Sequence, residues 1–441
     1  MVNPPLRPPG RRAVLGGLAS AAGAFAVAAA TPAAQAAGPR AGASAAALPA
    51  THTLAPSGAW CWFGDPRAVH HRGRHRRTFV GYITSFGDIR VTQYDHDSGA
   101  SVTSTLRTGF QIDDHNTPSI LIRHTGHVVV FWSGHQGPSM YYRRSVAVED
   151  ISQGWERTKE IPTNTEGGTG YTYPNPVELS AENNKLYLFW RGGNYNPTWS
   201  TTTGGDRWTD ASTLVSVPGE RPYVKVASND VDTIHFAFTE AHPRNLNTSI
   251  YHMYYRAGSL YRTDGSRIGP LSTAVTPAQA TKVYDAGSGG GKSWIHDIAL
   301  NSQGHPVLTF ARFPTDTDHR YHYAQWNGTA WDDQELTAAG GTIAEKPGEI
   351  NYSGGITLDH TNPSVVLLSR RIGSVNEIER WTTTNGGTTW EREAVTADST
   401  VTQVRPLTPR GLDSGERLGI LWMAGRYPSY TEYQTHIQAT S

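Results

Sequence analysis

Histidine, tyrosine and arginine recur beside the short apolar segments of this chain. The segment DDHNTPSI, residues 113–120, places two aspartates, a histidine and an asparagine directly before an apolar run. His135 in FWSGHQG and Arg191 in FWRGGN follow other apolar runs in the same way. Histidine and tyrosine serve as general acids and bases, and arginine binds carboxylate or sulfate through two parallel hydrogen bonds. A site that combines these three residue types is suited to proton transfer on an anionic ligand.

The overall composition narrows the class of protein. Lys+Arg and Asp+Glu both number 38 in 441 residues, and this balance argues against binding to nucleic acid. The 46 glycines and 27 prolines indicate many turns, and the single cysteine, Cys61, excludes an intramolecular disulfide.

The N-terminal residues are typical of an export signal. Arg11 and Arg12 precede an apolar run and a stretch of small residues, which favours twin-arginine export over an ordinary secretory signal, the alternative. We therefore expect a signal over residues 1–37, a disordered tail over 38–54 and a single catalytic domain over 55–441. No other apolar run reaches the ~18 residues of a membrane span, so we expect a secreted protein without a membrane partner.

Short strands separated by turn-rich hinges repeat along the remaining chain. Pairs such as SILIR with VVVFW and PVELS with LYLFW give seven strand–hinge–strand units, spaced by about 57 residues. Their first strands begin near residues 65, 117, 175, 222, 296, 354 and 405. The turns in residues 199–210 and 381–393 are similar, and 324–336 is a looser copy. We predict an all-β fold, a seven-bladed β-propeller.

This fold places the start of each first strand and the end of each second strand on the same face. The predicted starts carry Asp65, Arg67, His115, Asn116, Tyr173, Asn175, Arg221, Tyr223, His296, Asp297, Tyr352 and Arg405. The predicted ends carry His135, Arg191, His242, Arg312, Arg370, Arg371 and Arg426. We expect these side chains to converge on one polar funnel. The alternative is that they cap strands or bridge blades.

The funnel inventory favours β-elimination from a uronate over hydrolysis. Glycoside hydrolysis normally needs two carboxyl groups, and this list holds few acids. A sialidase-type tyrosine mechanism stays an alternative. In β-elimination an arginine neutralises the carboxylate, a histidine or tyrosine removes the adjacent proton, and another protonates the leaving oxygen. No metal or cofactor is required.

Several motifs resemble those of a known family. GAWCWFGDPRAV, DDHNTPSI, YTYPNPVEL, FWRGG, RPYVKVAS, TEAHPR and SIYHMYYRAG resemble the BNR-repeat propellers that contain ulvan lyases and rhamnosyl-glucuronate lyases, over residues 55–436. The resemblance implies that His115, His135 and Tyr173 act in acid–base catalysis. It also implies that Arg191 neutralises the uronate and that Tyr223 contacts the substrate.

Other expected site residues come from the predicted geometry. Asn116, Arg221 and His296 stand at strand starts, so we expect them to bind substrate. Tyr171 is a nearby alternative to Tyr173.

The resemblance also raises the question of a metal, because some relatives hold a structural zinc with a cysteine and histidines. We expect Cys61 in the buried core of the first blade and therefore no such zinc site. A cysteine-free version with His242 and His252, or a structural calcium, stays open.

Three functions remain in view from the sequence. The first is a polysaccharide lyase acting on a uronate-containing glycan of the ulvan or rhamnose–glucuronate type. The second is a sialidase-like or rhamnosidase-like hydrolase, and the third is a sugar-binding propeller without catalysis. In each case the expected partner is an anionic polysaccharide or oligosaccharide, and the expected state is a monomer.

Overall fold

The computed structural model describes residues 47–413 and 415–441. The predicted export signal and most of the predicted tail lie outside these residues. Within them, no helix has the length and apolar composition of a membrane span.

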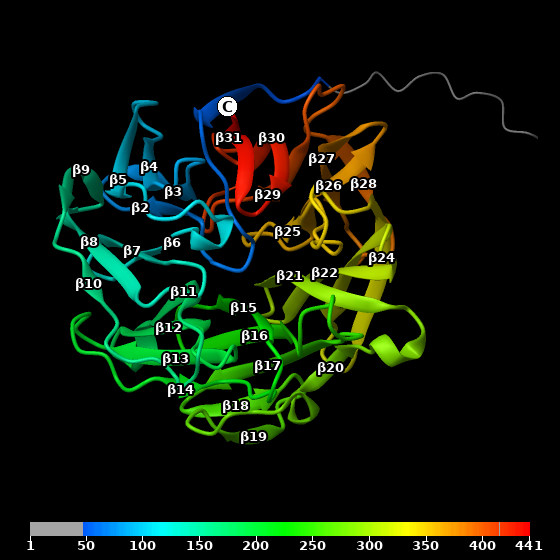
Figure 1. Ribbon diagram of the computed structural model, residues 1–441, viewed down its shortest axis with the longest axis horizontal. Helices are drawn as coiled ribbons and strands as arrows, with labels where there is room; N and C mark the ends of the chain where they lie inside the picture. Colours follow the sequence, from blue (N-terminus) through cyan, green and yellow to red (C-terminus); the bar gives the residue numbers. More distant parts are fainter. Residues whose placement is uncertain (1–46, 414) are drawn as a thin grey trace, which may run out of the picture. The chain divides into compact units, whose positions relative to one another are not determined.

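The described chain forms seven antiparallel sheets arranged as the blades of a propeller (Figure 1). The first blade contains β2 (Ala68–Arg72), β3 (Arg76–Ile83), β4 (Ile89–Asp95) and β5 (Ser101–Arg107). The second contains β6 (Ser119–Ile122), β7 (His127–Ser133), β8 (Met140–Val148), β9 (Asp150–Trp155) and β10 (Lys159–Glu160). The third contains β11 (Thr172–Leu179), β12 (Lys185–Arg191), β13 (Pro197–Thr202) and β14 (Ser212–Thr213).

The fourth blade is the largest, with six strands. It contains β15 (Tyr223–Ser228), β16 (Thr233–Thr239), β17 (Ile250–Arg256), β18 (Ser259–Arg262), β19 (Arg267–Pro270) and β20 (Thr281–Tyr284). The fifth contains β21 (Lys292–Leu300), β22 (Pro306–Thr315), β23 (Asp318–Trp326) and β24 (Trp331–Gly340). The sixth contains β25 (Ile356–Leu358), β26 (Val365–Ile372), β27 (Val375–Thr382) and β28 (Glu391–Ala394).

The seventh blade joins the two ends of the described chain. It contains β29 (Gln403–Leu407), β30 (Leu421–Ser429), β31 (Glu432–Thr440) and β1 (Thr51–Ala55). Short 3-10 helices are η1 (Asp114–Asn116), η2 (Ser180–Glu182), η3 (Pro277–Gln279) and η4 (Ala286–Ser288). The predicted seven-bladed propeller is confirmed, and the similar turns of residues 199–210, 324–336 and 381–393 each connect the third and fourth strands of a blade.

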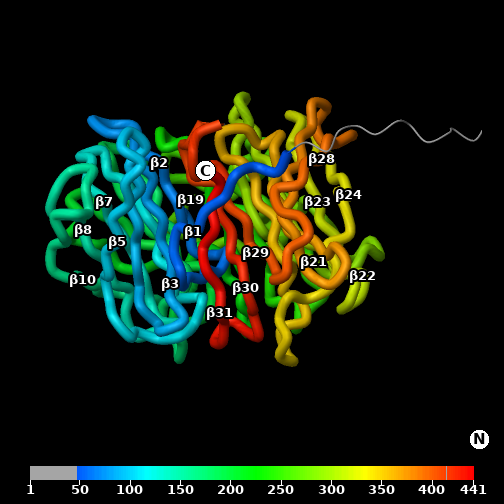
Figure 2. Tube along the Cα trace, turned by 90° about the horizontal axis from the view of Figure 1, so that it is seen from above, coloured from blue at the N-terminus to red at the C-terminus, as the bar shows by residue number. Residues whose placement is uncertain are grey.

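Strand β1 closes the ring, which corrects the predicted tail. Thr51 pairs with Thr440 and Thr53 with Gln438, so β1 forms the outer edge of the seventh blade beside β31 (Figure 2). The prediction of disorder through residue 54 was wrong for residues 51–54. The prediction judged this short threonine-containing segment by its composition alone. Pairing with a strand that is distant in the sequence satisfies the backbone hydrogen bonds of the segment.

The segment of residues 56–66 links the seventh blade to the first and fills the centre of the propeller. The Trp60 indole donates to the Arg405 carbonyl (3.0 Å), and the Trp62 indole donates to the Ile295 carbonyl (3.2 Å). Both tryptophans are buried. The segment therefore joins inner strands of several blades.

Cys61 belongs to this central segment. It is buried in the core, as predicted, at 2% exposure, but it lies outside the strands of the first blade. Its backbone N–H contacts the second blade, where it donates to Thr117 Oγ1 (2.9 Å) and to the Asp114 carbonyl (3.1 Å).

A buried ion network joins residues on or next to the first strands of several blades. Asp65 accepts from Arg67 Nε (3.0 Å) and pairs with Lys225, while Asp297 pairs with His360 at 3.2 Å. These three residues are therefore engaged in ion pairs inside the fold, as the alternative of strand capping and blade bridging predicts. Lys225 and His360 are distant in the sequence from the acids they pair with, so the sequence pattern does not reveal these contacts.

Trp60→Ala is expected to lower the free energy of unfolding by about 3–5 kcal/mol, because it opens a cavity in the centre of the propeller. Trp60 has 0% exposure, and its indole hydrogen bond is also lost. Denaturant unfolding followed by tryptophan fluorescence measures the change. Val146→Ala, at a residue with 56% exposure, is the control and should change stability by no more than ~0.5 kcal/mol. An equal effect of both variants would contradict the central role of Trp60.

Candidate active site

The loop before β6 presents an imidazole at the start of the second blade. Asp113 caps η1 by accepting the backbone N–H of His115 through Oδ1 (2.9 Å). The same oxygen also accepts from His115 Nδ1 (2.6 Å). Because this cap fixes both the backbone and the ring of His115, the polar start of DDHNTPSI has a direct structural cause.

His135 joins the same carboxylate from the end of β7. Its Nδ1 donates to Asp113 Oδ2 (2.9 Å), and its ring stacks on that of His115 with centroids 4.1 Å apart and an interplanar angle of 7°. Tyr430 packs edge-on against both rings. The predicted pairing of His115 with His135 is therefore present in the geometry.

The electrostatics of this group favour a charged carboxylate and a neutral His135. Burial opposes ionisation of Asp113, but the His115 and His135 imidazoles together hold its pKa well below the usual value. Burial, with the nearby His115, lowers the pKa of His135 to about 4 even though Asp113 opposes this shift. His135 is therefore able to accept a proton at neutral pH.

Tyr173 lies beside the imidazole pair because of a bulge in β11. The register of β11 against β12 shifts between Thr172 and Asn175, and Tyr173 has φ of 62°, a left-handed conformation that costs a tyrosine free energy. The ring lies 5.6 Å from that of His115. Burial raises the pKa of the Tyr173 phenol well above its usual value, although Arg191 opposes this shift, so the hydroxyl keeps its proton.

Arg191 is a buried cation without a carboxylate partner in the described part of the chain. It is only 4% exposed, and its guanidinium donates to Tyr223 Oη (3.3 Å) and Thr172 Oγ1 (3.5 Å). It also lies 4.8 Å from the centroid of the Tyr173 ring and 5.7 Å from that of Tyr195. A buried guanidinium held only by neutral groups is suited to an anionic ligand.

Tyr223 continues the site onto the fourth blade. Its ring packs 6.1 Å from Tyr173 and edge-on at 5.6 Å from His242. Arg221 is half-buried, and its charge acts on both Tyr223 and His242. We use the name central cluster for the five side chains that these contacts connect, namely His115, His135, Tyr173, Arg191 and Tyr223.

Two residues that the sequence predicts to bind substrate are buried and do not join the central cluster. Asn116 is 0% exposed, and its amide donates to the carbonyl and side chain of Gln111. His296 is 2% exposed and stacks on Trp62 with centroids 5.0 Å apart. Asn116 does precede β6, as predicted, but His296 lies in the middle of β21, so the predicted strand start near residue 296 was wrong. Both side chains are buried by other partners, and neither belongs to the site we propose.

His296→Phe is expected to make the protein less sensitive to acid. Burial, with Lys225 and Arg405, lowers the pKa of His296 to about 3, and neither ring nitrogen has a hydrogen-bond partner in the described chain. The unfolded chain therefore binds the proton first, and this histidine removes stability as pH falls below about 6.5. Between pH 7 and pH 5 the variant should lose roughly 2 kcal/mol less than the wild type.

Urea unfolding of both proteins at pH 7 and pH 5 measures this difference. The phenyl ring preserves the stacking on Trp62 and cannot take up a proton, so the comparison at pH 7 reports packing alone. Identical losses in the two proteins would show that His296 is not held neutral.

Several groups beside the cluster were missed or left without a role by the sequence reasoning. Tyr352 Oη lies 3.3 Å from His115 Nε2, and Tyr430 covers both imidazoles. Asp113 received no role from the sequence beyond its place in the segment DDHNTPSI. The sequence signal for its role is an aspartate two residues before His115. This spacing is typical of the residue that caps the N-terminus of a 3-10 helix or an α-helix.

Most of the other predicted arginines stabilise the scaffold. Arg405 donates to the Trp60 carbonyl (2.6 Å) and pairs with Asp114, and Arg370 pairs with Glu379 (2.7 Å). Such partners are what the alternative of strand-end bridging predicted. Arg191 differs from them because its neighbours are neutral.

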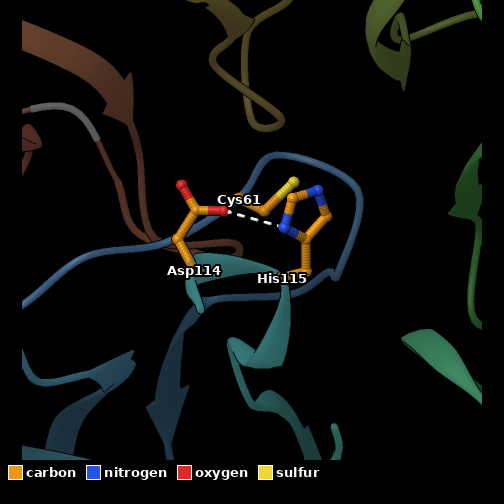
Figure 3. A group of neighbouring side chains, drawn as sticks. All are labelled: Cys61, Asp114 and His115. Carbon is orange, nitrogen blue, oxygen red and sulfur yellow. Dashed lines mark ion pairs between the residues drawn. The ribbon is translucent and has the colours of Figure 1, made fainter. Parts of the chain in front are cut away.

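Two groups of described residues have ligand atoms close enough together to hold a metal ion. One is Asp113 with His115 and His135, and the other is Asp114 and His115 with Cys61 (Figure 3). In the second group, burial raises the pKa of the Cys61 thiol to about 12, so a metal ion that bound there would have to displace the thiol proton.

The histidines considered for a cysteine-free zinc site have different surroundings. His252 bonds to His235, with 3.1 Å between Nε2 and Nδ1, and to Thr263. His242 instead packs on Tyr223 and Trp294. A structural calcium ion, or a zinc ion held without the cysteine, stays an open alternative.

The fold and the central cluster define a seven-bladed β-propeller with a polar centre. The chain belongs to the BNR repeat-containing family, whose model matches residues 77–339.

Curated relatives and solved structures extend this likeness. An ulvan lyase of Nonlabens ulvanivorans is 21% identical over 376 residues, covering 75% of this chain and 76% of the relative. An ulvan lyase of Pseudoalteromonas sp. (strain PLSV) is 28% identical over 163 residues, covering 31% of this chain and 32% of the relative. The structure of a PL25 ulvan lyase bound to -[GlcA(1-4)Rha3S]- superposes with a TM-score of 0.65 at 16% identity, covering 88% of this chain and 94% of that one.

Proposed function

We propose that this protein is a polysaccharide lyase that cleaves a uronate-containing, anionic polysaccharide by β-elimination. Three relatives named ulvan lyases support the class of activity. The ligand in the similar solved structure, a glucuronate linked to a sulfated rhamnose, supports the class of substrate. The observation that carries the proposal is Arg191, a buried guanidinium that has no carboxylate partner within residues 47–413 and 415–441 and lies next to two imidazoles and a phenol.

Arg191 neutralises the uronate carboxylate in this account. The C5 proton of a uronate becomes more acidic when the adjacent carboxylate is neutralised, because negative charge develops on that group as the proton leaves. Tyr223 orients the guanidinium through its hydroxyl. Arg221 adds positive charge at the edge of the cluster and binds the sulfate or carboxylate of a neighbouring sugar.

The imidazole pair and Tyr173 carry the proton transfers. A neutral imidazole removes the C5 proton, the C5–H electrons form the C4–C5 double bond, and the C4–O bond breaks. Tyr173, which keeps its phenolic proton, donates it to the leaving oxygen. Proton exchange with solvent then restores both groups, and no metal or cofactor takes part.

The proposed setting follows from the same chemistry. A polysaccharide substrate lies outside the cell, which agrees with an export signal over residues 1–37 and secretion of the domain. We propose that the secreted protein acts as a monomer, because one chain contains the whole cluster.

The test is a screen for unsaturated products. The protein is mixed with ulvan, pectin, gum arabic and glycosaminoglycans, and the ultraviolet absorbance of a new C4–C5 double bond is followed. We expect the signal with the glucuronate–sulfated rhamnose polymer. Release of reducing ends without that absorbance indicates a hydrolase, and binding without turnover indicates a sugar-binding propeller; either result contradicts the proposal.

A further inference from the structure

Asp113 connects both imidazoles through one buried carboxylate. The two oxygens are divided between the rings, Oδ1 to His115 Nδ1 at 2.6 Å and Oδ2 to His135 Nδ1 at 2.9 Å. The carboxylate side chain is only 3% exposed. Solvent therefore has little access to these two hydrogen bonds.

An ionised carboxylate accepts hydrogen bonds and donates none, so both Nδ1 atoms must carry the hydrogen. In a neutral imidazole the other nitrogen, Nε2, then holds the lone pair. The parallel stacking of the two rings matches this assignment, since it lets one carboxylate reach both Nδ1 atoms. Asp113 thus contacts the Nδ1 atoms of both histidines, and Asp114 Oδ1 lies 3.3 Å from His115 Nδ1 as a second acceptor (Figure 3).

The two Nε2 atoms have different surroundings. Tyr352 Oη lies 3.3 Å from Nε2 of His115, whose side chain is 5% exposed. Among the described residues, Nε2 of His135 has no such partner, and the side chain of His135 is 19% exposed. The lone pair that faces outward therefore belongs to His135.

We propose that Asp113 is a positioning residue that holds both imidazoles as Nδ1–H tautomers, so that His135 Nε2 removes the proton while His115 Nε2 accepts a hydrogen bond from Tyr352. This inference rests on the proposed lyase function and adds to it which histidine is the base. In the step itself, the C5 hydrogen moves to His135 Nε2, which becomes an imidazolium. Asp113 stabilises the new charge without taking up the proton.

Asp113→Asn tests the assignment with little change in shape. The asparagine oxygen still accepts a hydrogen bond from one imidazole. Its NH2 group can only donate, so it pairs with the other imidazole only if the Nδ1 of that ring carries no hydrogen. We expect one histidine to change to the Nε2–H tautomer and kcat to fall by about 10²-fold or more, as expected when a catalytic imidazole is held in the wrong tautomer, with little change in KM.

A matched control exists in the fifth blade. Asp333 Oδ1 accepts from His322 Nδ1 at 2.8 Å, the same kind of pair outside the cluster. Asp333→Asn should alter only the His322 signal and leave kcat unchanged. A general effect of losing an Asp–His pair would appear in both variants.

Nitrogen NMR of histidine-labelled protein reads the tautomers directly and does not depend on any activity. In the wild type we expect His115 and His135 to give Nδ1–H signals at neutral pH, assigned by their loss in His115→Ala and His135→Ala. An Nε2–H signal from either ring would overturn the inference, as would an Asp113→Asn variant with wild-type kcat. If the wild type shows the expected tautomers but forms no unsaturated product, the proposed function fails and the positioning role of Asp113 stands.

Discussion

His135→Ala is expected to lower kcat on a uronate polysaccharide by about 10²–10⁴-fold, the contribution of a positioned general base. The loss should fall on kcat more than on KM, since the imidazole acts on the proton and not on the carboxylate. Initial rates of double-bond formation over a range of substrate concentrations measure both constants.

The pH dependence of the rate tests the role of His135 independently. Only neutral His135 accepts a proton, and burial and His115 lower its pKa to about 4, with Arg191 acting in the same direction and Asp113 against it. The rate should therefore rise with pH on a limb near pH 4 and stay high through neutral pH. This limb should be absent from the residual activity of His135→Ala.

His127→Ala is the control for His135. His127 lies at the other end of the same strand, β7, where its Nδ1 bonds to the Ser145 carbonyl at 3.0 Å. Its kcat should match that of the wild type. Equal losses in the two variants would show that any damage to β7 removes activity and that His135 has no special role.

Arg191→Lys is expected to lower kcat/KM by about 10²–10³-fold although the positive charge is kept. A lysine cannot present two parallel N–H groups to a carboxylate, so the neutralisation of the uronate loses its geometry. The loss should appear in kcat, because the charge on the carboxylate grows in the transition state. Steady-state kinetics and binding of an uncleaved oligosaccharide separate the two effects.

Arg256→Lys is a matched change outside the cluster. Arg256 ends β17 and pairs with Asp232 at 3.2 Å. We expect this variant to keep its activity. Full activity of Arg191→Lys would mean that a point charge is sufficient and would contradict the bidentate role of Arg191.

The blade repeat could be predicted because its causes are local. Each unit is an apolar strand, a turn-rich hinge and a second strand, and hairpins of this kind form between neighbours in the sequence. The start of β6 and the end of β7 are also neighbours in one blade. His115 and His135 could therefore be placed together, and the start of β11 and the end of β12 place Tyr173 with Arg191 by the same rule.

The remaining features depend on contacts between distant parts of the chain. The WCWF segment was predicted to lie in the core of the first blade but fills the propeller centre, where Trp62 stacks on the buried His296. Strand β1 pairs with β31, at the other end of the described chain. The hydrogen bonds of Asp113 to two rings depend on a 3-10 turn whose side-chain directions the sequence does not specify.

The most direct test of the central claim is the fate of the leaving oxygen. A glucuronate–sulfated rhamnose oligosaccharide is incubated with the protein in water labelled with heavy oxygen, and the products are weighed by mass spectrometry. The account predicts a product that ends in an unsaturated uronate and a second product without heavy oxygen. Two saturated fragments with heavy oxygen at the cleaved position would mean that water was added across the bond, and β-elimination would be contradicted.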